Sequence, residues 1–207
     1  MRKTTMKTIT MLALVLVLTL AISPTAFGSA NANAKVGDKI QLGGIDWLVL
    51  AVEDGKTLVI SENILELRAY NSNLAIVTWE TCTLREYLNN SFYEGAFSSQ
   101  EKGRIAETKL VTADNPKYET PGGNDTTDKI FLLSGEEAEM YLPDQSTRVM
   151  RDMDGNKCFW WLRSPGKYSP NAVMSNAAAV YSDGEVSYFG YGVTFEYGVR
   201  PALWLNQ

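Results

Sequence analysis

The sequence contains no histidine, the side chain that most often acts as a general base near neutral pH. This absence excludes Ser-His-Asp triads, Cys-His pairs and histidine-ligated zinc. A glycine-rich phosphate-binding loop between a strand and a helix is also missing. Paired carboxylates remain, but Glu136 and Glu139 fall in the first turn of an expected helix, where the helix dipole already favours acidic residues. We therefore expect a protein that is not an enzyme.

The sequence has only one long apolar run, at residues 11–22 after a basic start. This run is shorter than the roughly 20 residues that a membrane-spanning helix needs. A small-x-small cleavage site follows at residues 32–34, with residues 30–32 as a second choice. These features predict a signal peptide over residues 1–34, and an uncleaved N-terminal anchor is the alternative. Residues 35–207 would then be secreted or lie on the extracellular surface, with no membrane span left after cleavage.

Cysteine is scarce, with only Cys82 and Cys158 present. Oxidising compartments form and keep disulfides, so export of the chain would favour pairing of these two residues. One expectation is therefore a disulfide between Cys82 and Cys158. The other is that they are two unrelated buried thiols.

Basic residues are outnumbered by acidic residues, 19 to 24, which gives a net charge of −5. Three of the basic residues and none of the acidic residues lie in the predicted leader, so the charge of the remaining chain is −8. An acidic surface repels phosphate backbones, which makes nucleic acid a poor candidate partner. No Lys/Arg cluster follows the leader, which also argues against binding to an anionic membrane surface. The remaining length is enough for one domain with a sizeable core.

Alternating apolar patterns predict strands at both ends of this domain. Asp54-Gly55 separates the β-rich runs 45–52 and 57–60, which is a strong hairpin signal, and 36–42 reads as a preceding strand. A second hairpin is expected around residues 182–185. Residues 199–205 (VRPALWL) are expected to form one last strand that inserts into a sheet.

Capping boxes predict short helices in the interior of the chain, beginning at Thr83, Ser98 and Ser134. Further strands are expected at 108–111 and 128–133, with long polar loops between the elements. Strands and helices that do not alternate regularly indicate an α+β fold.

The run FWWLRSPG at residues 159–166 predicts a buried central strand, with Trp160 and Trp161 in the core. Arg163 in this strand and Arg200 near the C-terminus both lie in apolar contexts. Buried guanidinium groups need partners, so we expect ion pairs with acids such as Glu86 or Asp128, and anion binding is the alternative.

Oxygen-bearing side chains alternate at Asp152, Asp154 and Asn156, with Gly155 between the last two. Clustered carboxylates of this kind suit calcium, although the spacing departs from that of an EF-hand loop. An ordinary Asp-Gly turn is the alternative. No cofactor other than calcium is indicated.

The C-terminal region is rich in aromatic residues interleaved with glycines and amides. Aromatic rings with nearby polar groups suit sugar rings or a protein surface, because the ring supplies apolar area and the polar groups fix the orientation. Tyrosines beside glycines are the ones we expect to be exposed. The candidate ligand-binding residues are Tyr168, Asn171, Tyr188, Tyr191 and Tyr197.

Four segments are specific in combination: TLREYLNNSFYEGAF at 83–97, TTDKIFLLS at 126–134, FWWLRSPG at 159–166 and GVRPALWL at 198–205. Together they resemble an uncharacterised domain family of secreted and surface proteins in Gram-positive, often gut-dwelling, bacteria. More distantly, that family resembles the C-type-lectin-like fold of formylglycine-generating enzymes and of retroelement-diversified binding proteins. The resemblance implies that N- and C-terminal strands join in one sheet and that ligand loops hang between the late strands.

Three functions follow from these features. The first is a secreted, non-catalytic binding domain that recognises a glycan or a protein through loops around 166–171 and 188–198. The second is a diverged enzyme of the formylglycine-generating type, which would hold copper between reduced, adjacent Cys82 and Cys158. The third is a structural domain of a cell-surface assembly.

Overall fold

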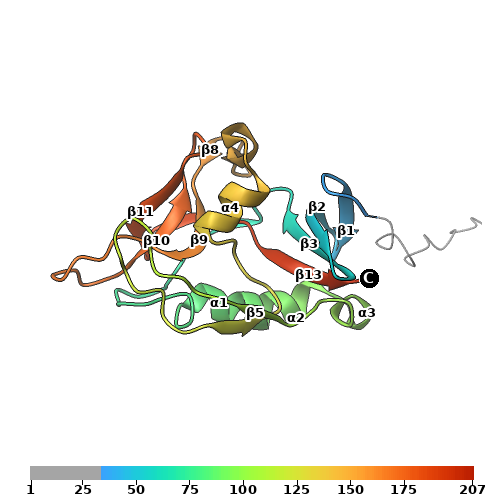
Figure 1. Cartoon of the computed structure of the whole chain (residues 1–207), viewed down its shortest axis with the longest axis horizontal. Helices are drawn as coiled ribbons and strands as arrows, with labels where there is room; N and C mark the ends of the chain where they lie inside the picture. Colours follow the sequence, from blue (N-terminus) through green and yellow to red (C-terminus); the bar gives the residue numbers. More distant parts are fainter. Residues whose placement is uncertain (1–33) are drawn as a thin grey trace, which may run out of the picture.

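The computed structural model describes residues 34–207, so the predicted signal peptide lies outside the described residues except for Ala34. The described chain has an α+β architecture in which strands outweigh short helices. Two antiparallel-rich sheets lie at opposite ends of the molecule, with α1 and α2 along one side and α4 on the other (Figure 1). No helix within residues 34–207 is long and apolar enough to cross a membrane.

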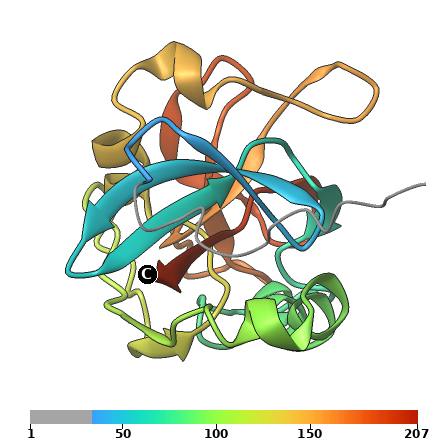
Figure 2. The same ribbon diagram turned by 90° about the vertical axis from the view of Figure 1, so that its right-hand side faces the viewer.

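The first sheet has four strands in the order β1-β2-β3-β13. Its hairpin turns at Asp54 and Gly55, whose φ angles of 47° and 72° are those of the tight turn that Asp-Gly favours. The last strand pairs antiparallel with β3, with Leu203 opposite Val59 (Figure 2). Both the hairpin and the insertion of the C-terminal strand are therefore confirmed. The strands are β1 (Lys39–Leu42), β2 (Ile45–Glu53), β3 (Lys56–Ser61) and β13 (Ala202–Asn206).

The second sheet has five strands in the order β11-β10-β9-β12-β4. The tryptophan strand β9 lies in the middle, antiparallel to β10 and parallel to β12. The predicted hairpin at 182–185 joins β10 to β11 and is confirmed. The strands are β4 (Glu66–Ala69), β9 (Trp160–Pro165), β10 (Asn176–Val180), β11 (Val186–Gly192) and β12 (Glu196–Val199).

Residues 199–205 do not form one strand, as the apolar pattern predicted. The chain leaves the five-stranded sheet at Val199 and enters the four-stranded sheet at Ala202. Pro201 lies in this crossing, where it has no N–H group to continue a ladder of hydrogen bonds. The single apolar run therefore links the two sheets.

The run 128–133 is also only partly a strand. β6 (Thr126–Asp128) pairs with β5 (Thr108–Leu110), but the buried residues after it form no regular strand. Instead, Phe131 exchanges backbone hydrogen bonds with Ala202 of β13. Burial without regular pairing gives the same apolar pattern as a strand, so the sequence could not separate the two.

Two of the three predicted capping boxes are confirmed, at Ser98 and Ser134. The third is wrong, because Cys82 is the N-cap of α1: its Sγ accepts the amide of Arg85, while the Thr83 hydroxyl accepts the amide of Ser72. The helices are α1 (Thr83–Tyr87), a π-helical turn η1 (Leu88–Phe92), α2 (Tyr93–Ala96), α3 (Ser99–Lys102), α4 (Gly135–Tyr141) and a 3-10 turn η2 (Gln145–Arg148). A small hairpin of β7 (Met150–Arg151) and β8 (Lys157–Cys158) follows.

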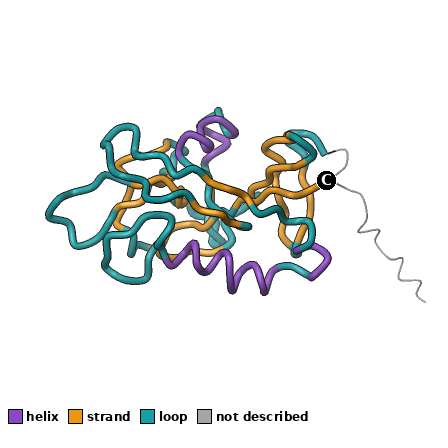
Figure 3. The backbone as a smooth tube through the Cα atoms, turned by 60° about the horizontal axis from the view of Figure 1, so that its bottom comes forward, coloured by secondary structure: helices purple, strands orange, loops and turns teal. Residues whose placement is uncertain are grey.

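One hydrophobic core runs from the first sheet to the second and includes the buried Trp47, Trp79, Trp160 and Trp161. Long loops gather at the end of the molecule away from the C-terminus (Figure 3). Backbone amides form hydrogen bonds between these loops: the amide of Ser175 donates to Ala75 O (3.0 Å), and that of Tyr168 donates to Thr120 Oγ1 (2.9 Å). The loops thus extend from strands that pack around the hydrophobic core.

Candidate functional site

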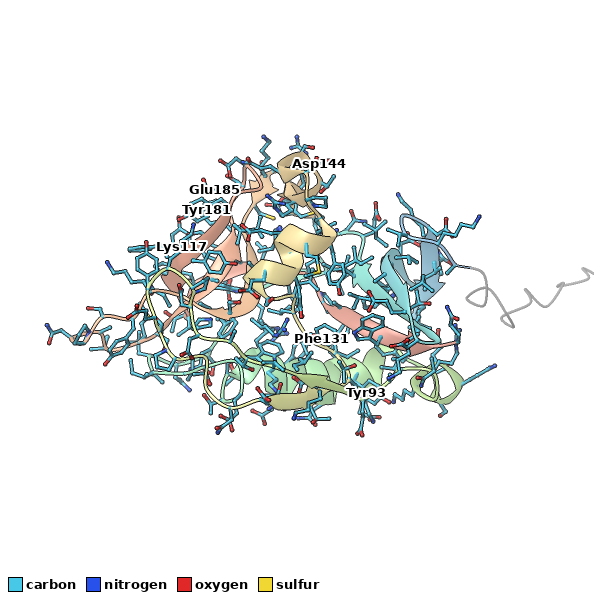
Figure 4. The ribbon with its side chains drawn as sticks, in the orientation of Figure 1. Tyr93, Lys117, Phe131, Asp144, Tyr181 and Glu185 are labelled. Atoms are coloured by element: carbon cyan, nitrogen blue, oxygen red, sulfur yellow. The ribbon has the colours of Figure 1, made fainter. Side chains whose placement is uncertain are left out.

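Five aromatic rings that are only partly buried lie together on the five-stranded sheet. They come from strand ends and turns that are distant in sequence, and the sheet register brings them together. Tyr181 directly follows β10 and begins the turn that carries Glu185, whose carbonyl oxygen accepts the amide of Tyr181 (2.8 Å; Figure 4). We call this surface the aromatic face; its members are Phe159, Tyr181, Tyr191, Phe195 and Tyr197.

Phe159 is the centre of the aromatic face. Its ring centroid lies 5.2 Å from the centroids of Tyr181, Tyr191 and Tyr197, stacked on the first two and edge-on to the third. Phe195, which is 52% exposed, stacks on Tyr197 at 6.2 Å. These are the separations at which aromatic pairs attract one another, so the rings hold each other in place.

The rings rest on a buried layer that fixes them. Trp161 is fully buried, lies 4.9 Å from Tyr197 and donates its indole N–H to Arg68 O. Tyr70 packs edge-on to Trp161 at 5.6 Å and donates its hydroxyl to Arg163 O. The aromatic face is therefore the outer layer of a rigid aromatic stack.

Polar groups accompany the rings. The Ser187 hydroxyl donates to the Tyr181 hydroxyl (2.8 Å), and Arg68, opposite Tyr197 in the sheet register, pairs with Glu66 (2.9 Å). Burial, followed by the neighbouring Tyr181 hydroxyl, raises the pKa of Tyr191 above its ordinary value. Its hydroxyl is therefore neutral at physiological pH and can both donate and accept a hydrogen bond.

The other face of the sheet is covered by α4 and holds Arg163. This guanidinium donates from Nη1 to Glu137 Oε2, from Nη2 to Glu137 Oε1 (2.7 Å), and to Leu132 O (3.2 Å). The expected ion pair of Arg163 is confirmed, but its acid is Glu137 and not Glu86 or Asp128; Asp128 instead pairs with Arg85 at 2.7 Å. A cavity of about 360 Å³ lies beside the Arg163–Glu137 pair, between α4 and β5.

Tyr188 belongs to this covered side, although a glycine neighbour suggested that it would be exposed. It is 4% exposed, its hydroxyl donates to Glu139 Oε2 (3.4 Å), and burial raises its pKa. Its ring packs so closely on Gly135 that a Cβ there would lie 2.6 Å from ring atoms. Tyr188 therefore packs against α4, and the prediction that it would be exposed was wrong.

Tyr168 and Asn171 are exposed in the loop after β9, with Tyr168 at 45%. Tyr168 lines a mostly apolar pocket of about 290 Å³ where three loops meet, together with Ile76 and Pro121. The same loop borders the aromatic face at its far end, where Met174 contacts Thr194 (3.5 Å).

Sequence reasoning assigned Tyr191 and Tyr197 to the ligand site, and the structure brings them together. It missed Phe159, Tyr181 and Phe195. Tyr181 and Phe195 flank turns at Asp183-Gly184 and Gly192, so the same proximity to a turn that selected the others would have selected them. Phe159 looked like part of the buried strand, and only the register separates it from Trp160.

The disulfide between Cys82 and Cys158 is not formed, because both thiols are free. Cys82 is 2% exposed, donates its S–H to Trp79 O and accepts the amide of Arg85, which explains its position as a helix cap. Burial raises the pKa of its thiol to about 12, so it is an unreactive thiol. Cys158 lies in the β7–β8 hairpin opposite Met150. This geometry gives the copper-enzyme hypothesis no support.

The segment from Asp152 to Asn156 forms the turn between β7 and β8. Asp152 Oδ1 accepts the amides of Asp154 (3.0 Å) and Asn156 (2.9 Å), and Gly155 has a φ of 84°. Within residues 34–207 there is no group of three or more acidic or cysteine side chains arranged to hold a metal ion. The geometry is that of an Asx turn, and calcium binding here stays a prediction.

A family model described as a domain of unknown function (DUF6273) matches residues 54–207. The chain belongs to this family. The DUF6273 match includes every residue of the aromatic face and both faces of the five-stranded sheet. No curated protein and no solved structure matches the chain. The function therefore has to be argued from the geometry of the site.

Proposed function

We propose that the protein is a secreted, non-catalytic domain that binds a neutral oligosaccharide on its aromatic face. The observation that carries the proposal is the cluster of five partly exposed rings centred on Phe159, in which each ring contacts at least one other. The C–H faces of sugar rings pack on aromatic rings, which supply apolar area without losing much side-chain entropy. Secretion rests on the leader pattern of residues 1–34.

We further propose a C-type-lectin-like fold. Two features support this assignment: the first and last strands of the described chain share one sheet, and long loops project from the late strands. Gly198-Val199-Arg200, at the end of β12, would then correspond to the terminal G-x-R strand that the resemblance implies.

The size and polarity of the site favour a chain of sugars over a single sugar. Centroid spacings of 5.1–6.2 Å from Tyr191 through Tyr197 to Phe195 give a row of rings longer than one pyranose. Neutral tyrosine hydroxyls and the Arg68–Glu66 pair can then orient the hydroxyls of the sugar. The net charge of the chain is acidic, which disfavours a polyanionic glycan.

A glycan array followed by titration calorimetry tests the proposal. The chain should bind a class of neutral oligosaccharides, and Tyr197→Ala should weaken that binding at least about tenfold, a loss of about 1.4 kcal/mol. Tyr118→Ala is the matched control, because Tyr118 is equally aromatic and 39% exposed but pairs with Phe189 outside the aromatic face. Silence across the array, or equal loss in both variants, would overturn the proposal.

A further inference from the structure

Arg200 lies in the crossing between β12 and β13 and is 2% exposed. Its Nε donates to Ser61 O (2.9 Å), and its guanidinium carbon lies 5.3 Å from the centroid of the Trp160 ring. Its Nη1 is buried and has no hydrogen-bond partner among the described residues. No carboxylate in residues 34–207 lies within ion-pair distance of it. The guanidinium group of Arg200 is thus held in place, but only part of its hydrogen-bonding capacity is used.

The other two buried arginines differ from Arg200 in this respect. Arg163 has a bidentate carboxylate partner in Glu137. Arg148 donates to the carbonyl oxygens of Gly184, Leu142 and Pro143. Arg163 Nε is also buried without a partner, but the guanidinium groups of Arg163 and Arg148 make four and three hydrogen bonds. Arg200 makes one within the described residues, so it is the least satisfied of the three buried arginines there.

Arg200 lines a groove of about 800 Å³ between the segment after β3 and the β7–β8 hairpin. Glu62 lines the same groove: its Oε1 pairs with Lys39 (2.9 Å), but its Oε2 is buried without a partner. Leu48, Val149 and Met150 supply an apolar wall. The groove therefore contains one unpartnered donor and one unpartnered acceptor of opposite charge.

A buried charge without a partner is destabilising, because desolvation is not offset. Burial lowers the pKa of Arg200 to about 10, but the group remains a cation at neutral pH. A bound anion would supply the missing acceptor, and a donor on the same ligand would satisfy Glu62. An unsatisfied buried polar group in a native structure needs an explanation, and a bound ion or ligand is one such explanation.

We propose that this groove is a second ligand site, which binds a small carboxylate carrying a hydroxyl or ammonium group on the adjacent carbon. The carboxylate accepts hydrogen bonds from Arg200, and the hydroxyl or ammonium donates to Glu62. The apolar wall contacts the rest of the ligand. This site is separate from the aromatic face and does not depend on the proposed glycan binding.

The experiment titrates the full chain with glycine, glycolate and acetate, each up to about 10 mM, and follows binding by NMR shifts and by the rise in Tm. Glycine or glycolate should bind at least about tenfold more tightly than acetate, because only they offer a donor to Glu62. Preference for glycine would identify an amino acid as the ligand type, and preference for glycolate a hydroxy acid. Equal, weak binding of all three would overturn the proposal.

Two variants test the assignment of each residue. Arg200→Met should abolish binding of every probe. Because Arg200→Met can also impair folding, Glu62→Gln serves as the second variant: it should reduce glycine affinity at least about tenfold while glycolate, which can still donate to the amide oxygen, changes less.

The controls are Arg104→Met and Tyr197→Ala. Arg104 lies at a different pocket, beside α3, and is not among the residues that line the groove, so its loss should leave all three affinities unchanged. Tyr197→Ala should also leave them unchanged, because it alters only the aromatic face. A folded Glu62→Gln that binds glycine like the parent protein would contradict the site.

Discussion

The two faces of the five-stranded sheet are built from the same strands but treat their polar and aromatic groups differently. Under α4, Arg163 is paired with Glu137, Tyr188 donates to Glu139, and the ring of Tyr188 is closed off by Gly135. On the aromatic face, Tyr191 stacks on Phe159 and Tyr197 packs edge-on to it, but both remain partly exposed. The comparison teaches that one face is closed by α4 and stabilises the fold, whereas the other keeps aromatic rings partly exposed, as the proposed glycan site requires.

The largest effect should come from breaking the covered face. Arg163→Met leaves the Glu137 carboxylate without its cation, so the free energy of unfolding should fall by about 3–5 kcal/mol. Lys39→Met is the control, because its pair with Glu62 has a lysine side chain that is 64% exposed and should matter by at most about 1 kcal/mol. Urea unfolding measures both. Equal losses would contradict the distinction between the covered pair and an exposed one.

Cys82 caps α1, and its thiol lies beside Tyr70 of the buried layer beneath the aromatic face, which gives a pH-dependent prediction. The pKa of Cys82 is raised to about 12 by burial, whereas an unfolded thiol titrates at about 8.5. The contribution of this thiol to the free energy of unfolding is therefore fully present below the pKa of the unfolded thiol. As pH rises from there towards 12, this contribution falls by about 1.4 kcal/mol for each pH unit. Cys82→Ala should flatten this part of the stability profile. Cys158→Ala, at a half-buried site, should leave it steep, and the reverse pattern would contradict the account.

Removing the hydroxyl group of one tyrosine on each face should have smaller effects and separates the roles of the two faces. Tyr188→Phe should cost about 1 kcal/mol of stability, because Glu139 loses a hydrogen-bond donor, and should leave glycan affinity unchanged. Tyr191→Phe should do the opposite, with little change in Tm and a weaker glycan interaction. Thermal unfolding and calorimetry on both variants make the test. If only Tyr188→Phe weakened glycan binding, the ligand would bind the face under α4 and not the aromatic face, which would contradict the account.

The smallest effect is expected at the loop that borders the aromatic face. Tyr168→Ala and Asn171→Ala should weaken binding of long oligosaccharides by about threefold or less, because these exposed residues can reach only the end of an extended ligand. Affinity for the shortest bound oligosaccharide should not change. If these variants instead removed all binding, the loop would be the centre of the site.

Local signals in the sequence predicted several parts of the fold. Asp54-Gly55 determines its own turn, and Ser134 with Glu137 caps α4, because both interactions are made within a few residues. The sequence could not show whether the buried residues 128–133 form a regular strand or are buried without one. It also could not show that the apolar run around Pro201 belongs to two strands and not to one. Whether such a run forms a strand depends on the distant segments with which it pairs, and no local sequence pattern predicts that pairing.

The site followed the same rule. Tyr191 and Tyr197 were predicted as ligand residues because glycines lie beside them; the structure places their rings 5.1 Å apart, and their ligand role stays a prediction. Tyr188 was predicted to be exposed for the same reason but is buried, since successive residues of a strand point to opposite faces. The partners of Arg163 and the isolation of Arg200 arise from contacts between distant segments, and composition could not predict either.

The most direct test of the central claim is a crystal structure of the chain bound to the neutral oligosaccharide that ranks highest on the array. We predict sugar rings stacked on Tyr191 and Tyr197, with their hydroxyls near the Arg68–Glu66 pair. A sugar bound instead in the cavity between α4 and β5, with the aromatic face unchanged, would contradict the account.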